Sequence, residues 1–164
     1  MGMMRKLLMG GSGKKQIGTL FSTNGEHPNG TPLPTSITMV EGLTYHFIYT
    51  GNVTIASTAT KWPFYLYGGN NASLFGCRFM SKRLCFLAYA YQLTSNTYSS
   101  GLTLTSAELI VTMRKSSIVY SAKINGTYVA SNIENTRYGS SVGIPTFTTY
   151  GNLEGNFEII STKE

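Results

Sequence analysis

The sequence predicts an all-β protein: an antiparallel β-sandwich or jelly-roll-like body with an extended N-terminal arm. About nine or ten short runs of alternating apolar and polar residues follow one another at hairpin-like spacing, without a clear helical segment. The composition is rich in Thr, Ser, Asn, Gly and aromatic residues, which favour pleated strands and turns. An Asn125-Gly126 pair between two alternating runs is the strongest hairpin signal in the chain, because a type I′ turn needs positive φ at both positions.

The composition also limits the chemistry. A chain of 164 residues suits one domain with a real core, and only 12% of its residues are charged. All seven acidic residues are Glu, so Asp is absent as a metal ligand, triad member or glycosidase acid. The chain has no G-x-S-x-G motif, no P-loop and no CxxC or HxxxH pair. We therefore expect a protein that is not an enzyme and that needs no cofactor or metal.

Residues 1–36 are predicted to form the arm, and residues 37–164 the antiparallel β domain. The first fifteen residues contain four basic side chains and no acid: Arg5, Lys6, Lys14 and Lys15. They are candidates for holding an acidic partner or another subunit, with a solvated tail as the alternative. Extended, 36 residues could reach on the order of 120 Å. No run approaches the roughly 20 apolar residues of a membrane span, and no signal peptide is predicted.

The predicted central hairpin covers residues 117–133. A two-residue turn at Asn125-Gly126 would pair Ile124 with Thr127, Lys123 with Tyr128, Ala122 with Val129, Tyr120 with Ser131, and Ile118 with Ile133. A second hairpin is predicted from residues 43–50 and 53–60 around Gly51-Asn52. His46 lies in it and is interpreted as a neutral sheet histidine bonded to a neighbour rather than a catalytic group.

The other predicted strands are residues 37–41, 62–67, 74–80, 84–92, 102–113, 144–150 and 157–162, the last two as a closing hairpin. Pro63 places its strand at an edge or marks a strand start. Residues 84–92 are apolar on both faces and are placed centrally. The apolar phase of residues 102–113 switches near Ser106, which indicates a bulge or break, with a helix over 106–113 as the alternative. Cys77 and Cys85 are predicted as free buried thiols on one face, across a turn at 81–83.

Five aromatic residues are candidates for binding a ligand or partner. Trp62, Tyr65 and Tyr67 lie on one short strand, and Tyr98 and Tyr138 lie in predicted loops. Exposed flat rings suit sugars or a protein partner, whereas ordinary core and cross-strand packing is the competing interpretation. Nucleic acid is not favoured as a partner, because the basic residues do not interleave with the aromatics in the sequence.

The segments MRKLLMGGSGKK and NGEHPNGTPLP, followed by a Thr/Asn/Gly-rich β domain, resemble small bacteriophage virion structural proteins of the capsid-decorating, head-fibre, tail or baseplate type. The resemblance implies a homo-oligomeric subunit of a larger assembly, anchored by its arm and located in the virion among other virion proteins. The alternative is a carbohydrate- or receptor-binding adhesin module that binds a host-surface glycan. A β-sandwich hydrolase using His46 is the third hypothesis.

Overall fold

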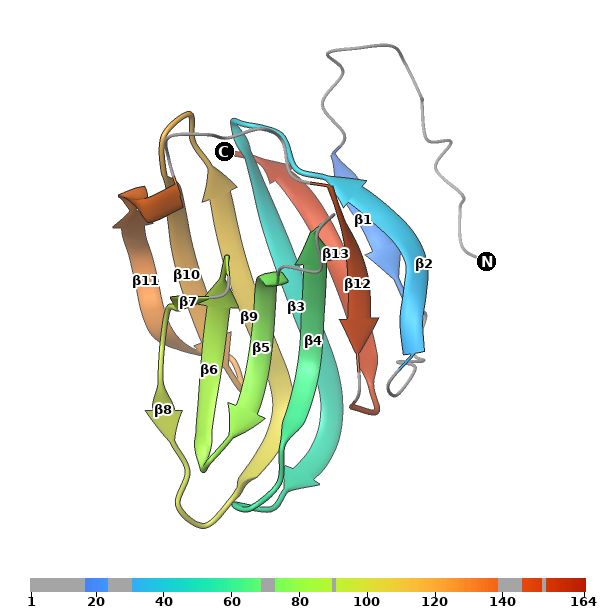
Figure 1. Ribbon diagram of the computed structural model, residues 1–164, viewed down its shortest axis with the longest axis vertical. Helices are drawn as coiled ribbons and strands as arrows, with labels where there is room; N and C mark the ends of the chain where they lie inside the picture. The colour runs from blue at the N-terminus through green and yellow to red at the C-terminus, as the bar shows by residue number, and fades with distance from the viewer. Residues whose placement is uncertain (1–16, 24–30, 69–72, 90, 139–145, 152) are drawn as a thin grey trace.

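The computed structural model describes residues 17–23, 31–68, 73–89, 91–138, 146–151 and 153–164, and they form two antiparallel sheets packed face to face (Figure 1). The six-stranded sheet has the order β1-β13-β3-β9-β10-β11, with β1 (Gly18–Ser22), β3 (Leu43–Ile55), β9 (Leu102–Met113), β10 (Ile118–Ile124), β11 (Thr127–Asn135) and β13 (Asn156–Lys163). The seven-stranded sheet has the order β2-β12-β4-β5-β6-β7, with β2 (Thr31–Thr38), β4 (Lys61–Gly68), β5 (Ser73–Met80), β6 (Arg83–Ala88), β7 (Tyr91–Gln92) and β12 (Thr146–Gly151). A short β8 (Asn96–Thr97) also pairs with β6, and a 3-10 helix (Thr136–Tyr138) follows β11. The predicted antiparallel β-sandwich is confirmed.

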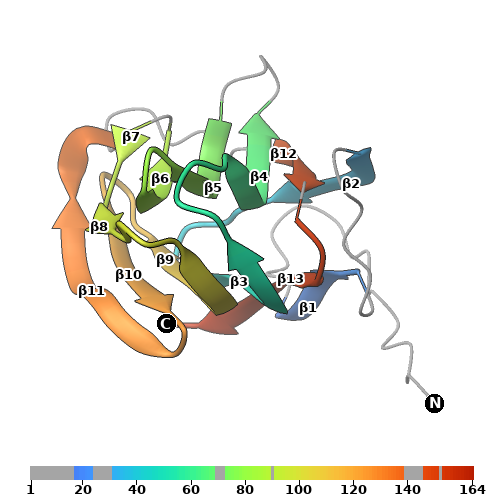
Figure 2. The ribbon, with the colours of Figure 1, turned by 90° about the horizontal axis from the view of Figure 1, so that it is seen from below.

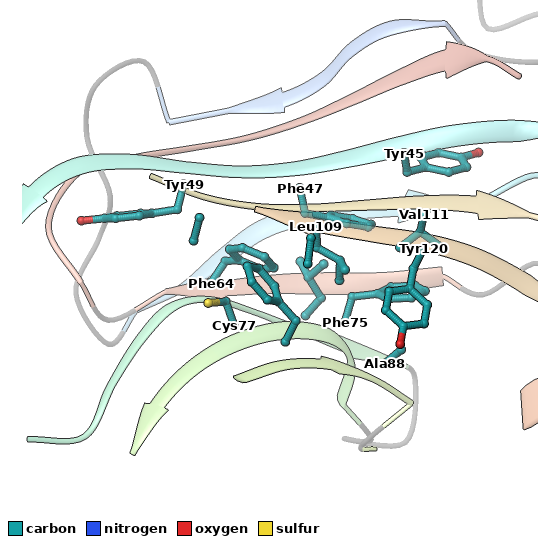
Figure 3. Packing of buried hydrophobic residues seen from close by; sticks show 14 of the residues in the cluster. Tyr45, Phe47, Tyr49, Phe64, Phe75, Cys77, Ala88, Leu109, Val111 and Tyr120 are labelled. Atoms are coloured by element: carbon teal, nitrogen blue, oxygen red, sulfur yellow. The ribbon is translucent and has the colours of Figure 1, made fainter. Parts of the chain in front are cut away.

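The two sheets face each other (Figure 2), and the largest side chains of the core between them are aromatic (Figure 3). Alternate residues of β3 point inward, and among them Phe47 stacks on Phe75 with ring centroids 5.2 Å apart. Phe64 of β4 stacks on Phe157 of β13 at 5.1 Å, and both rings are buried. These contacts join strands of opposite sheets, so aromatic packing holds the two layers together.

Residues 18–22 and 31–36 were predicted to belong to the arm, but in the structure they form strands of the β domain. β1 pairs with β13, and β2 pairs with β12, so one strand joins each sheet. Pro32 and Pro34 both lie in β2, although proline cannot donate a hydrogen bond to a strand ladder. However, β2 is the outermost strand of its sheet, and a proline there can direct its missing amide away from the ladder. The predicted arm residues Arg5, Lys6, Lys14 and Lys15 lie outside the described residues.

The Asn125-Gly126 turn is confirmed, with φ of 50° and 79° at its two residues. Ile124 faces Thr127 and Lys123 faces Tyr128 as predicted. Farther from the turn the register shifts, so the observed pairs are Ala122 with Ala130, Tyr120 with Ile133, and Ile118 with Asn135. The cause is a pair of irregularities in β11. At the second, Asn132 has a φ of 50° and donates its backbone N–H to Ser121 Oγ.

The predicted hairpin at Gly51-Asn52 is wrong. Residues 43–55 form one continuous strand, β3, which pairs with β9 along its length. The Gly-Asn pair instead lies in a bulge, because Thr50 faces Ser106 and Val53 faces Leu104. This bulge explains the phase switch of β9 that the sequence showed near Ser106. The predicted bulge is thus confirmed, and the alternative helix over 106–113 is wrong.

The side chain of Asn125 stabilises this bulge from the neighbouring hairpin. Its Oδ1 accepts hydrogen bonds from the backbone N–H groups of Thr105 at 2.8 Å and Ser106 at 3.2 Å. Its Nδ2 donates to the carbonyl oxygen of Thr103 at 2.9 Å. One residue therefore makes the β10–β11 turn and satisfies the backbone groups that the bulge leaves without strand partners.

Three further predictions of strand placement need correction. The turn between β5 and β6 consists of Ser81 and Lys82 alone, both with positive φ, so Arg78 faces Cys85. This one-residue difference directs Cys77 into the core and Cys85 to the opposite face, although both thiols are buried and free as predicted. β4 lies between β12 and β5, so the edge position predicted from Pro63 is wrong, but Pro63 does lie near the start of its strand, as its third residue. The closing hairpin is wrong because β12 and β13 belong to different sheets.

Candidate binding face on the seven-stranded sheet

The outer face of β4 carries a row of three aromatic side chains, Trp62, Tyr65 and Tyr67, which we call the aromatic row. Phe64 and Leu66 point into the core, so the alternating residues Tyr65 and Tyr67 point outward. A bulge between Lys61 and Phe64 lets Trp62 join them. The ring centroids of Trp62 and Tyr65 are 4.5 Å apart, and those of Tyr65 and Tyr67 are 4.8 Å apart. The planes of Trp62 and Tyr65 are tilted by 42°, and Tyr65 and Tyr67 meet edge to face at 77°, so the three half-buried rings that the sequence singled out form a contiguous cluster.

A glycine under the row explains how Tyr65 is oriented. Gly76 of β5 lies directly opposite Tyr65, on the outer face between the inward-pointing Phe75 and Cys77. A Cβ atom at Gly76 would lie 2.6 Å from Cδ2 of Tyr65 and 3.1 Å from Cε2. The Cδ2–Cε2 edge of the ring therefore lies over β5, in space that the side chain of any other residue at position 76 would occupy. The glycine within a strand-like run was a signal for this close approach that the sequence interpretation did not use.

The strand next to the aromatic row, β5, carries a positively charged side chain, Arg78. Arg78 lies two residues after Gly76 on the same face of β5 and pairs with Cys85 of β6. Its Nε atom is buried and has no hydrogen-bond partner among the described residues. On β6, Sγ of this cysteine donates a hydrogen bond to Oε1 of Gln92 in β7 at 3.4 Å.

The other two predicted aromatics do not join the row. Tyr98 is half-buried against the core, its backbone N–H donates to the carbonyl of Lys82 at 2.6 Å, and burial raises the pKa of its hydroxyl. Tyr138 ends the 3-10 helix, and its side chain lies outside the described residues. Its neighbour Arg137 instead stacks over the ring of Tyr91 at 5.4 Å and links the ends of the two sheets.

A polar network crosses the outer face of the other sheet, and the sequence analysis missed it. Glu108 of β9 accepts from His46 Nδ1 on β3 at 3.0 Å and from Lys123 Nζ on β10 at 3.2 Å. Lys123 also lies over the ring of Tyr128 at 4.8 Å, and Nε2 of His46 is 3.5 Å from Oγ1 of Thr162. These residues are far apart in the sequence, and only the strand order brings them together.

The hydroxyl of Thr162, the imidazole of His46 and the carboxylate of Glu108 follow one another in the order used in nucleophilic catalysis. The Thr162–His46 contact is long at 3.5 Å, and Lys123 occupies the second oxygen of Glu108. The groups also lie on a paired sheet, whose amides point along the ladder rather than converging on a reacting oxygen. We therefore interpret the network as cross-strand stabilisation.

The network predicts a pH dependence of stability. The hydrogen bond from His46 holds the pKa of Glu108 below its ordinary value of 4.5, although burial opposes the shift. A carboxyl group with a lowered folded-state pKa stabilises the fold above its unfolded pKa, and this contribution is lost as pH falls through the folded pKa. We expect the urea midpoint of the wild type to fall more steeply between about pH 5 and pH 3 than that of Glu108→Gln. Glu41→Gln, in an exposed turn, is the control and should keep the pH dependence of the wild type. If the urea midpoints of Glu108→Gln and Glu41→Gln changed with pH in the same way, the prediction would be contradicted.

No family model matches the sequence, and no curated protein matches it. Among solved structures, the chain is similar to an alginate lyase from polysaccharide lyase family 7 (TM-score 0.48, 12% identity, 79% of this chain and 63% of that chain). It is also similar to a variant of human galectin-16 (TM-score 0.45, 9% identity, 84% and 100%). A third is the CBM2 module of an evolved Dit protein from Lactobacillus casei BL23 phage J-1 (TM-score 0.42, 12% identity, 77% and 66%).

The assignment of the fold as a β-sandwich is based on the strand pairing within this protein and not on these similarities. The described residues contain no helix with the length and apolar character of a membrane span. Within the same residues, no three His, Cys or Glu side chains are grouped as metal ligands.

Proposed function

We propose that this protein is a carbohydrate-binding β-sandwich module without catalytic activity, and that the aromatic row is its ligand platform. The observation that carries the proposal is the ring of Tyr65, which occupies the space over Gly76 and contacts the rings of both Trp62 and Tyr67. The C–H faces of sugar rings pack on aromatic rings, which offer large apolar area with a polar edge. Because the rings are already held by one another and by the sheet, little side-chain entropy remains to be lost on binding.

A glycan array followed by calorimetric titration of the full-length protein tests the platform. Trp62→Ala and Tyr65→Ala should each weaken glycan binding about tenfold or more, which corresponds to roughly 1.4 kcal/mol for a lost stacking contact. Tyr128→Ala is the matched control, because it removes an exposed tyrosine from the other sheet. An array without signal above background, or row variants that bind like the wild type, would rule the platform out.

A second candidate function is that of a subunit in a virion or similar assembly, and β11 favours it. β11 is the outermost strand of the six-stranded sheet, and it exposes 55% of Tyr128 and 43% of Ile133. An exposed edge strand with apolar side chains is suited to pairing with another chain.

Light scattering after gel filtration tests this candidate. The wild type should form an oligomer, and Ile133→Lys should shift it to a smaller mass, because it places a charge on the pairing edge. Deleting residues 1–16 tests the basic arm separately, since that deletion leaves every described strand in place. A wild type that elutes as a monomer at all accessible concentrations would end the assembly hypothesis.

A further inference from the structure

We propose that the ligand of the aromatic row is an acidic saccharide, and that Arg78 binds its carboxylate or sulfate group. This inference rests on the proposed carbohydrate-binding function and names the class of sugar. Three independent features of the seven-stranded sheet support it: the position of Arg78, the unsatisfied donor of its side chain, and the distribution of charge between the two sheets.

The first feature is position. Arg78 follows Gly76 by two residues on β5, so both belong to the outer face that Tyr65 covers. The bulge of β4 sets Trp62 and Pro63 opposite Arg78, because Lys61 faces Phe79 and Phe64 faces Cys77. The guanidinium group therefore starts from the strand next to the aromatic row, beside the Trp62 end. A saccharide stacked on Trp62 and Tyr65 would bring its ring substituents to this residue.

The second feature is the Nε donor of Arg78. It is buried and has no hydrogen-bond partner among the described residues, and unsatisfied donors of this kind are uncommon in folded proteins. Leaving a buried donor unpaired costs about 1–3 kcal/mol. Nε and a terminal nitrogen together form the planar fork that matches the two oxygens of a carboxylate or sulfate. Arg78 as a whole is only partly buried, so an anionic ligand that displaces the cover over Nε would satisfy this donor.

The third feature is charge. The strands of the seven-stranded sheet carry Lys61, Arg78 and Arg83, with Lys82 in the adjoining turn, and they contain no glutamate. The glutamates of the described residues lie on the six-stranded sheet, in turns, or at the last residue: Glu41, Glu108, Glu134, Glu154, Glu158 and Glu164. One layer of the sandwich is therefore purely basic, and its field favours an anion over a neutral ligand.

Calorimetric titration of the full-length protein tests the proposal with a matched pair of probes, oligogalacturonate and its methyl ester, beside a glycan array with acidic and neutral members. We expect the protein to prefer acidic glycans, and Arg78→Gln to weaken their binding tenfold or more. Arg78→Lys keeps the charge but loses the fork, so it should restore only part of the affinity. Lys115→Gln removes an exposed positive charge from the bend after β9, outside the seven-stranded sheet, and is the control that should stay within about twofold of the wild type. Thermal unfolding of each variant establishes that it is folded.

The outcomes separate this inference from the proposed function. Binding that depends on Tyr65 but is equal for acidic and neutral glycans would overturn the role of Arg78 and leave the carbohydrate platform intact. Absence of binding to every glycan on the array would overturn both. Binding of a thymidine oligonucleotide that depends on Tyr65 and is tighter than that of any acidic glycan would assign the face to nucleic acid instead.

Discussion

Replacing Gly155 by alanine is expected to destabilise the fold by about 3 kcal/mol, from backbone strain and overpacking together. Gly155 has a φ of +141°, a conformation that residues with a side chain rarely adopt. A Cβ atom there would overlap the carbonyl oxygen of Thr50 and lie 2.7 Å from Cε2 of Tyr49. Neither neighbour can move aside easily, because the carbonyl oxygen of Thr50 belongs to the backbone of β3 and the ring of Tyr49 is fully buried.

This turn also anchors Tyr49, whose hydroxyl donates to the carbonyl oxygen of Glu154. Burial, with a smaller contribution from the charge of Glu154, raises the pKa of Tyr49 to about 12. Urea unfolding measures the prediction, and Gly126→Ala is its control. Gly126 also has positive φ, at +79°, but an added Cβ would meet nothing within 4 Å, so only about 1 kcal/mol of strain is expected there. Equal losses for the two variants would contradict the steric argument.

The sequence was sufficient for the fold class, because that class follows from local patterns. Alternation along β3, β5 and β13 is visible in any short window, and Asn125-Gly126 allows one turn type. The phase switch in β9 correctly indicated a bulge, because the pleat has a strict period of two residues. Each of these features depends on neighbours within a few positions.

The errors arose where a local signal has two structural solutions. Gly51-Asn52 can close a hairpin or form a bulge, and the partner strand β9 decides between them. The turn before β6 differs from the predicted one by a single residue, which reverses the face of Cys85. Proline in β2 is compatible with a loop or with an edge strand, and only the sheet order shows which of the two is present.

The same distinction applies to the candidate sites. Trp62, Tyr65 and Tyr67 are close in sequence, so the aromatic row could be proposed from one strand. Only the register of β4 with β5 places Arg78 on the strand beside the row. The contact of His46 with Glu108 spans 62 positions and depends on the order of strands, which no local pattern contains.

Adjacent residues of β4 should separate stability from binding. Phe64 is fully buried, and its ring contacts those of Phe47, Phe86 and Phe157, with centroids 6.3, 6.5 and 5.1 Å away. Phe64→Ala should therefore cost about 3–5 kcal/mol of unfolding free energy, from lost burial and the cavity left between the sheets. Phe64→Leu is the control that keeps most of the volume and should cost much less.

Tyr65→Ala should have the opposite profile: a strong loss of glycan binding with a smaller loss of stability, since Tyr65 lies on the outer face over Gly76. Successive strand residues point to opposite sides of the sheet, so the core and the proposed platform share one strand without sharing a residue. Urea unfolding and glycan titration of the two alanine variants measure both effects. If Phe64→Ala abolished binding while remaining as stable as the wild type, the orientation of β4 would be reversed, and the assignment of the platform would fail with it.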